Sequence, residues 1–95
     1  MNIHSLHSGE KKVSAVSFFK GNGGIAIALQ IGEMQELKEH VSKVPALLIC
    51  LEGEAVFEDE NGISEKLFFG DYVNIKPMLK HKVRAIANSS LLLIK

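Results

Sequence analysis

The sequence has no excess of charge of either sign, and this absence narrows the possible partners. Lysine and arginine together number 11, aspartate and glutamate also number 11, and the formal net charge is therefore zero. A chain without a basic surplus has no electrostatic reason to bind a phosphate backbone, so we expect no nucleic-acid partner. A net charge near zero also gives weak repulsion between copies, which is compatible with association into dimers.

Cysteine is nearly absent, and no apolar run is long. Cys50 is the only cysteine in 95 residues, so an internal disulfide is excluded. Its place inside an apolar run indicates a buried thiol and favours a reducing compartment. No run approaches the roughly 20 apolar residues of a membrane-spanning helix, and residues 1–12 contain no apolar signal region. We therefore expect a cytoplasmic protein with no membrane partner.

The apolar residues that are present suffice for one core. Hydrophobic residues make up 46% of the chain and charged residues 23%, as in an ordinary globular domain. We interpret residues 1–95 as a single domain, in which the polar residues 1–12 form an N-terminal arm. In its middle, six apolar residues (46–51) precede Glu52-Gly53-Glu54, after which residues 55–57 are apolar again. This pattern predicts a buried strand that bends at Gly53.

Much of the remaining chain has the pattern of short strands. In residues 25–31 the large aliphatic side chains occupy every second position, which is the period of a strand. The glycine-rich residues 21–24 and the pair Asn61-Gly62 predict hairpin turns. We expect a further turn at residues 88–90 and further strands at residues 13–19, 63–69, 72–75, 81–87 and 91–94. Short strands separated by turns predict an all-β barrel or sandwich.

Residues 33–44 are ambiguous between helix and strand. Met34, Leu37, Val41 and Val44 are spaced three, four and three residues apart, and mostly polar residues fill the gaps. On local pattern alone this spacing favours an amphipathic helix. A strand is supported only by residues 37–41, whose alternation is weak.

Two segments resemble the motifs of the cupin superfamily, whose members are small jelly-roll barrels. Residues 70–81 resemble the second motif, G-x5-P-x-G-x2-H-x3-N. Gly70 and His81 have the separation of that motif, whereas Lys76, Met78 and Ala85 occupy its proline, glycine and asparagine positions. The resemblance covers about two-thirds of the chain, from about residue 29 to the end.

Residues 34–53 resemble the first cupin motif, G-x5-H-x-H-x3–4-E-x6-G. His40 and Gly53 match it in spacing, Ser42 occupies its second histidine position, and Ala46 occupies its glutamate position. The leading glycine has no counterpart at position 34. The resemblance implies a double-stranded β-helix, or jelly-roll, barrel, and it makes residues 33–44 a strand rather than a helix.

The resemblance also implies a site inside the barrel. In metal-binding cupins the three histidines and the glutamate of the motifs hold a divalent transition metal, and only His40 and His81 remain here. The Ser42 hydroxyl is neutral and therefore a poor ligand, and Ala46 supplies none. We expect either no cofactor or a divalent transition metal bound weakly by His40 and His81.

Alternation along the strands extends the inward face around the two histidines. If Ala46 faces inward, so should Leu48 and Cys50, and residues 83 and 85 should share the face of His81. On this face we expect no aspartate or glutamate near the histidines, except Glu52 at the bend. The candidate ligand-binding residues are His40, Ser42, Leu48, Cys50, Met78 and His81.

Two functions are compatible with these residues. The first is a non-catalytic protein that binds or senses a small molecule in the barrel cavity. The alternative is a metal-dependent enzyme of oxygenase or isomerase type that uses His40 and His81 as metal ligands. The missing ligands favour the first, and no catalytic residue is identified. We also expect a homodimer, as the resemblance implies and as strands that are apolar on both faces indicate.

Overall fold

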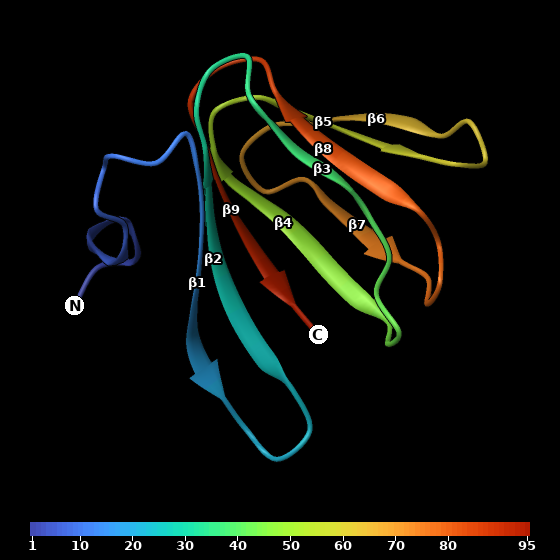
Figure 1. Cartoon of the computed structure of the whole chain (residues 1–95), viewed down its shortest axis with the longest axis horizontal. Coiled ribbons are helices and arrows are strands. Elements are labelled where there is room, and N and C mark those ends of the chain that lie inside the picture. Colours follow the sequence, from blue (N-terminus) through green and yellow to red (C-terminus); the bar gives the residue numbers. More distant parts are fainter.

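The computed structural model describes residues 1–95 as two antiparallel β-sheets with a short helix at the N-terminus (Figure 1). The elements in chain order are the 3-10 helix η1 (Ile3–Leu6) and the strands β1 (Val13–Lys20), β2 (Ile25–Ile31), β3 (Glu36–His40), β4 (Ala46–Glu52), β5 (Ala55–Asp59), β6 (Ser64–Leu67), β7 (Tyr72–Ile75), β8 (His81–Ala85) and β9 (Ser89–Ile94). No helix is long and apolar enough to cross a bilayer.

The strands form a five-stranded sheet of order β1-β2-β9-β4-β7 and a four-stranded sheet of order β3-β8-β5-β6. Every pairing is antiparallel, and strands pair only within their own sheet. The predicted all-β class is therefore confirmed. The arrangement is that of a jelly roll built from two sheets, not a barrel closed by strand pairing.

The core lies between the two sheets and is filled by side chains from both. Along β4, Ala46, Leu48 and Cys50 are buried while the residues between them are half-buried, and β8 shows the same alternation from His81 to Ala85. The prediction of this inward face is confirmed. A cluster of 13 buried apolar residues, with Phe57 as its largest fully buried side chain, occupies the space between the sheets.

Gly53 makes the sharp bend between β4 and β5, where the chain passes from one sheet to the other. Its φ is +91°, and a Cβ at this position would lie 2.3 Å from the carbonyl oxygen of Asn88. Only glycine fits such a backbone at such a close approach. The predicted bend and the predicted Asn61-Gly62 hairpin are both confirmed; Gly62 has a φ of +85° in the turn between β5 and β6.

The helix that local spacing favours for residues 33–44 is wrong, and the strand implied by the cupin resemblance is confirmed. Residues Glu36–His40 form β3, which pairs with β8, and Leu37 lies opposite Val83 and packs against the core. The amphipathic spacing is overridden because the edge of β8 offers both backbone partners and an apolar surface.

One smaller expectation needs correction, and the structure shows where the expected N-terminal arm lies. Strand β9 begins at Ser89, so the expected turn is limited to the residues before it; the Ser89 hydroxyl accepts from the Glu54 N–H at 3.1 Å. The N-terminal arm docks on the five-stranded sheet beside β1, with His7 Nδ1 2.6 Å from Ser14 Oγ and His4 Nδ1 3.3 Å from Ser90 Oγ (Figure 1).

Candidate functional site

Two histidines lie side by side between the sheets. His40 is the last residue of β3, His81 is the first residue of β8, and the two are paired across the strands. Their imidazole rings meet edge to face, with centroids 4.2 Å apart and an interplanar angle of 61°. The side chain of His81 is buried, whereas that of His40 is half-buried, so solvent reaches the pair from the side of β3.

The backbone determines which ring nitrogen carries the proton. Nδ1 of His40 lies 2.9 Å from the carbonyl oxygen of Lys38, and Nδ1 of His81 lies 2.9 Å from that of Leu79. A carbonyl only accepts, so each Nδ1 is the donor, and in the neutral rings the lone pair is on Nε2. Burial lowers the pKa of His81, and His40 lowers it further, against the opposing effects of the Leu79 carbonyl and Asp59.

Phe57 covers the other side of His81. The two rings are stacked, with centroids 5.6 Å apart and an interplanar angle of 28°. Phe57 is itself 1% exposed and belongs to the core. His81 is therefore held between an aromatic ring from β5 and the imidazole of His40.

A cavity of about 500 Å³ lies next to Phe57, between β6 at the edge of one sheet and β7 at the edge of the other. Phe57, Ile63, Val73 and Leu79 give it apolar walls. The polar groups around it come from β5, the β5–β6 hairpin, β6, β7 and the residue after β7, and are Asp59, Asn61, Glu65, Tyr72, Asn74 and Lys76.

Two carboxylates share the inner face of the four-stranded sheet, contrary to the expectation that only Glu52 would lie there. Asp59 is paired with His81, and Glu65 is paired with Phe57, so both point to the same side as these inward residues. The alternation Ala55, Phe57, Asp59 was the available signal. Asp59 also stabilises the hairpin, since its Oδ1 accepts from the backbone N–H groups of Asn61 and Ile63.

The remaining sequence-predicted residues lie apart from this cavity. Leu48 and Cys50 are 1% and 0% exposed in the packed core, and burial raises the pKa of the Cys50 thiol. Ser42 is buried in its own turn, where its hydroxyl donates to the Val44 carbonyl at 2.8 Å. Met78 is 62% exposed, although its backbone N–H donates to the Ser42 carbonyl at 2.7 Å. A backbone hydrogen bond thus joins the loop of Ser42 to the loop of Met78. Of the residues that the sequence predicts for the site, only the two histidines contact each other.

The residues present fit a resident metal poorly. No three side chains of histidine, cysteine, aspartate or glutamate are grouped closely enough to hold an ion. The two Nε2 lone pairs of His40 and His81 have the tautomer that a ligand needs, with each Nδ1–H held by a carbonyl. Two imidazoles leave most of a coordination sphere to water, which makes any metal binding weak.

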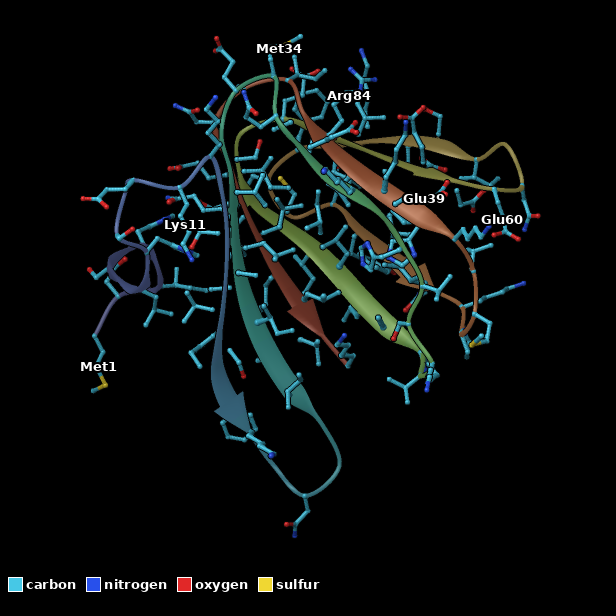
Figure 2. All side chains as sticks on the ribbon, in the orientation of Figure 1. Met1, Lys11, Met34, Glu39, Glu60 and Arg84 are labelled. Carbon is cyan, nitrogen blue, oxygen red and sulfur yellow. The ribbon has the colours of Figure 1, made fainter.

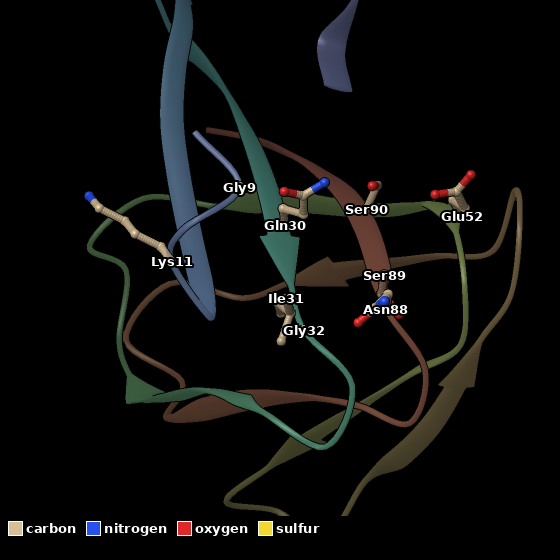
Figure 3. A pocket seen from close by; sticks show the side chains of 9 residues that line it. All are labelled: Gly9, Lys11, Gln30, Ile31, Gly32, Glu52, Asn88, Ser89 and Ser90. Atoms are coloured by element: carbon tan, nitrogen blue, oxygen red, sulfur yellow. The ribbon is translucent and has the colours of Figure 1, made fainter. Parts of the chain in front are cut away.

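A second, smaller hollow of about 240 Å³ lies where the arm meets the five-stranded sheet (Figure 3). Its lining includes Lys11 and Glu52, which Figure 3 shows at opposite sides, together with Gln30, Asn88 and Ser90. Glu52, the one carboxylate expected near the histidines, therefore lies at this hollow instead. Asn88 is already engaged, because its Oδ1 accepts from the Glu33 N–H at 2.7 Å.

Comparison with known proteins finds likeness in structure without likeness in sequence. No protein-family model and no curated protein matches the chain. A cupin superfamily protein of Desulfitobacterium hafniense superposes over 98% of this chain and 84% of its own, with a TM-score of 0.86 and 15% identity. An RmlC-like cupin protein of Desulfovibrio desulfuricans superposes over 99% and 94%, with a TM-score of 0.81 and 18% identity.

A third similar structure is a cupin of double-stranded β-helix architecture. An RmlC-like cupin with a double-stranded β-helix fold, from Methanocaldococcus jannaschii, superposes over 94% of this chain and 84% of its own, with a TM-score of 0.79 and 14% identity. Two antiparallel sheets around a shared core already define an all-β protein of jelly-roll type. The superpositions show that this chain has the cupin fold.

Proposed function

We propose that this protein binds a small organic molecule between the edges of its two sheets and does not catalyse a reaction. The observation that supports this function is the cavity of about 500 Å³ between β6 and β7, which is lined by apolar residues on one hand and by six residues with polar groups on the other. Small-molecule sites in proteins have volumes of about 300–1,000 Å³, and this cavity lies in that range. The buried, reduced Cys50 agrees with the cytoplasmic location that we expect for such a protein.

The walls of the cavity suggest how a ligand is held. Ile63, Val73 and Leu79 offer apolar surface, and Phe57, which is 1% exposed and stacks on His81, lies behind them as part of the core. Glu65 and Lys76 stand on opposite sides, one on β6 and the other just after β7. A ligand with an apolar body and polar groups at its ends matches this distribution.

The alternative, a metal-dependent oxygenase or isomerase, is not favoured. A catalytic metal in proteins is usually held by at least three protein ligands, and here only His40 and His81 converge. His81 is moreover enclosed by Phe57 on one side, and it is 4% exposed. We therefore propose that any divalent metal binds these histidines weakly and is not needed for ligand binding.

A fragment screen followed by amide chemical shifts tests the proposal, because a chain of 10.4 kDa is well suited to nuclear magnetic resonance. We expect hits whose shift changes cluster on β6, β7 and the residues before β8, with and without chelator. Glu65→Gln should weaken binding of polar hits at least roughly tenfold, since hydrogen bonds to a charged group contribute about 1.5–3 kcal/mol.

The matched control is Glu39→Gln, which makes the same change at an exposed position of β3 away from the cavity. It should leave the affinity of every hit unchanged. Shift changes that cluster at the hollow beneath the arm, or binding that chelator abolishes, would contradict the proposed site.

A further inference from the structure

The hollow between the N-terminal arm and the five-stranded sheet has hardly any apolar surface. Nine residues line it, and Ile31 is the only one of them with an apolar side chain. Its volume of about 240 Å³ is smaller than the roughly 300–1,000 Å³ of sites for drug-sized ligands. The hollow therefore suits a small molecule that is recognised through polar groups.

The arm forms one wall of this hollow because it is attached to the sheet at two places. The carbonyl oxygen of Lys12 accepts from the Gly32 N–H at 2.7 Å, and His7 Nδ1 lies 2.6 Å from Ser14 Oγ. Between these attachments, residues 8–11 make no hydrogen bond to the sheet, and part of this segment lines the hollow. The hollow is thus enclosed by the arm on one side and by the sheet on the other.

Two charged side chains of opposite sign line the hollow, and neither is paired. Lys11 and Glu52 lie at opposite sides of it (Figure 3). The one ion pair of the protein joins Arg84 to Glu58, so the ammonium group of Lys11 and the carboxylate of Glu52 are both free to bind a ligand. Both side chains are exposed, so water occupies their charged groups until a ligand replaces it.

Oxygen atoms from three strands converge on the Glu52 side. Cross-strand pairing places Gln30, Ser90 and Glu52 in one row, which we call the oxygen row, and Figure 3 shows the three side chains along one side of the hollow. Ser90 is 6% exposed. The amide oxygen of Gln30, the hydroxyl oxygen of Ser90 and the carboxylate of Glu52 are all acceptors, as an ammonium group requires.

Asn88 adds hydrogen-bond donors to the lining. Its Oδ1 accepts from the Glu33 N–H at 2.7 Å. The carbonyl part of the side-chain amide is therefore engaged, and the two N–H donors of Asn88 remain for another partner. Together with the ammonium group of Lys11, these donors match a carboxylate.

We propose that this hollow binds a small zwitterion, a molecule that carries one ammonium and one carboxylate group. The ammonium group contacts the oxygen row, and the carboxylate contacts Lys11 and Asn88. A simple anion would meet the unpaired Glu52, and a simple cation would meet the unpaired Lys11, so a molecule with both charges is the better match. The site is separate from the cavity between β6 and β7, and its occupation does not depend on the function proposed for that cavity.

Amide chemical shifts of the full chain, titrated with glycine, β-alanine and 4-aminobutanoate, test the proposal. The three probes carry the same two charges at increasing separation, and none has a bulky apolar body. We expect at least one of them to cause saturable shift changes at residues 30–32, 52 and 88–90. Propionate and propylamine carry one charge each, and they should bind at least roughly tenfold more weakly because hydrogen bonds to a charged group are lost.

Two substitutions test the two ends of the site separately. Glu52→Gln and Lys11→Met should each weaken binding of the tightest probe at least roughly tenfold. Both residues are exposed, so neither change disturbs the core. The matched controls are Glu39→Gln, on β3, and Lys12→Met, at the next residue of the arm, which does not line the hollow. Each control should leave the affinity unchanged within about twofold.

Three results would overturn the proposal. The first is the absence of saturable shift changes at the hollow with all three probes. The second is binding of propionate or propylamine as tight as that of the tightest probe. The third is an equal loss of affinity in Lys11→Met and Lys12→Met, since the effect would then come from the charge of the arm as a whole and not from a contact in the hollow.

Discussion

The two sheets differ in where they carry polar groups. The outer face of the five-stranded sheet carries mostly uncharged residues such as Leu47, Ile49 and Leu92, and its inner face is apolar over the central strands, where Ser89 is the buried polar residue. The four-stranded sheet has charged residues outside, among them Arg84 (Figure 2), and His40, His81, Asp59 and Glu65 inside. One sheet therefore supplies most of the apolar packing, and the other supplies the chemistry of the candidate site.

The difference between the two sheets shows what an uninterrupted apolar run indicates in a small all-β chain. Residues 46–51 and 91–94 are apolar at every position, and both become central strands of the five-stranded sheet. A strand covered on one face only needs alternation, so an unbroken run indicates that something covers both faces. In the four-stranded sheet, β8 places the charged residues Lys82 and Arg84 between its inward residues, because its outer face meets water.

The largest expected effect on the free energy of unfolding comes from substitutions on the inner faces, where the two sheets should contribute equally to stability. Leu91→Ala on the five-stranded sheet and Phe57→Ala on the four-stranded sheet, at 0% and 1% exposure, should each lower the free energy of unfolding by about 3–5 kcal/mol. Urea denaturation at one fixed protein concentration measures both.

The matched control for these substitutions is Phe69→Ala, since Phe69 is 80% exposed. Its effect should stay within about 0.5 kcal/mol. An inner-face substitution that costs no more than this control would show that its sheet does not contribute to the core.

A smaller effect on the free energy of unfolding is expected from the protonation of His81, the buried histidine of the four-stranded sheet. Burial lowers the folded-state pKa of His81 below 6.5, although Asp59 opposes this, and His40 and Lys95 add to it. The unfolded chain therefore binds more protons in mild acid, so this stabilising contribution is present above pH 6.5 and is lost as the pH falls through the lowered pKa.

Unfolding in chelator-containing buffer at neutral and at mildly acidic pH measures this contribution. The wild type should lose more free energy of unfolding on acidification than His81→Gln does. His7, whose pKa burial also lowers, is present in both proteins, so the difference isolates His81. Equal losses would contradict the desolvation of this ring.

The smallest effect should come from the charged outer face. Arg84 Nε lies 3.9 Å from Glu58 Oε1, and the two side chains are 39% and 34% exposed. Exposed pairs contribute little because water and salt screen them, so Arg84→Ala should lower the free energy of unfolding by less than about 1 kcal/mol. A larger loss would mean that this face is covered in the native protein, which would break the contrast between the two sheets.

Local pattern was sufficient for those parts of the fold whose signals are local. Strands β2 (Ile25–Ile31) and β7 (Tyr72–Ile75) have the predicted bounds, and Gly53 and Gly62 lie at the predicted bend and turn. Alternation also predicted which residues of β4 and β8 face inward. Each of these features depends on a few neighbouring residues, so it can be read without knowing the partner strands.

The candidate site was only partly predictable, because it is made by pairing between distant strands. The two motif remnants placed His40 and His81 near one another, and the rings are 4.2 Å apart. The cavity beside Phe57 was missed, since it is formed by the edges of β6 and β7, which belong to different sheets. Asp59 was missed because it is the last residue of β5 and lies next to the turn-forming residues in sequence, so only its pairing with His81 places it on the inner face.

The sequence by itself determined the all-β class, the turns, the inward face of the central strands and the neutrality of the whole chain. Only the tertiary structure decided the bounds of β3 and its pairing with β8, the place of Glu65 and Asp59 beside the cavity, and the alignment of mostly apolar residues across the outer face of five strands. The physical reason is register: alternation determines the face of a residue within its strand, whereas its neighbours on that face depend on how distant strands pair.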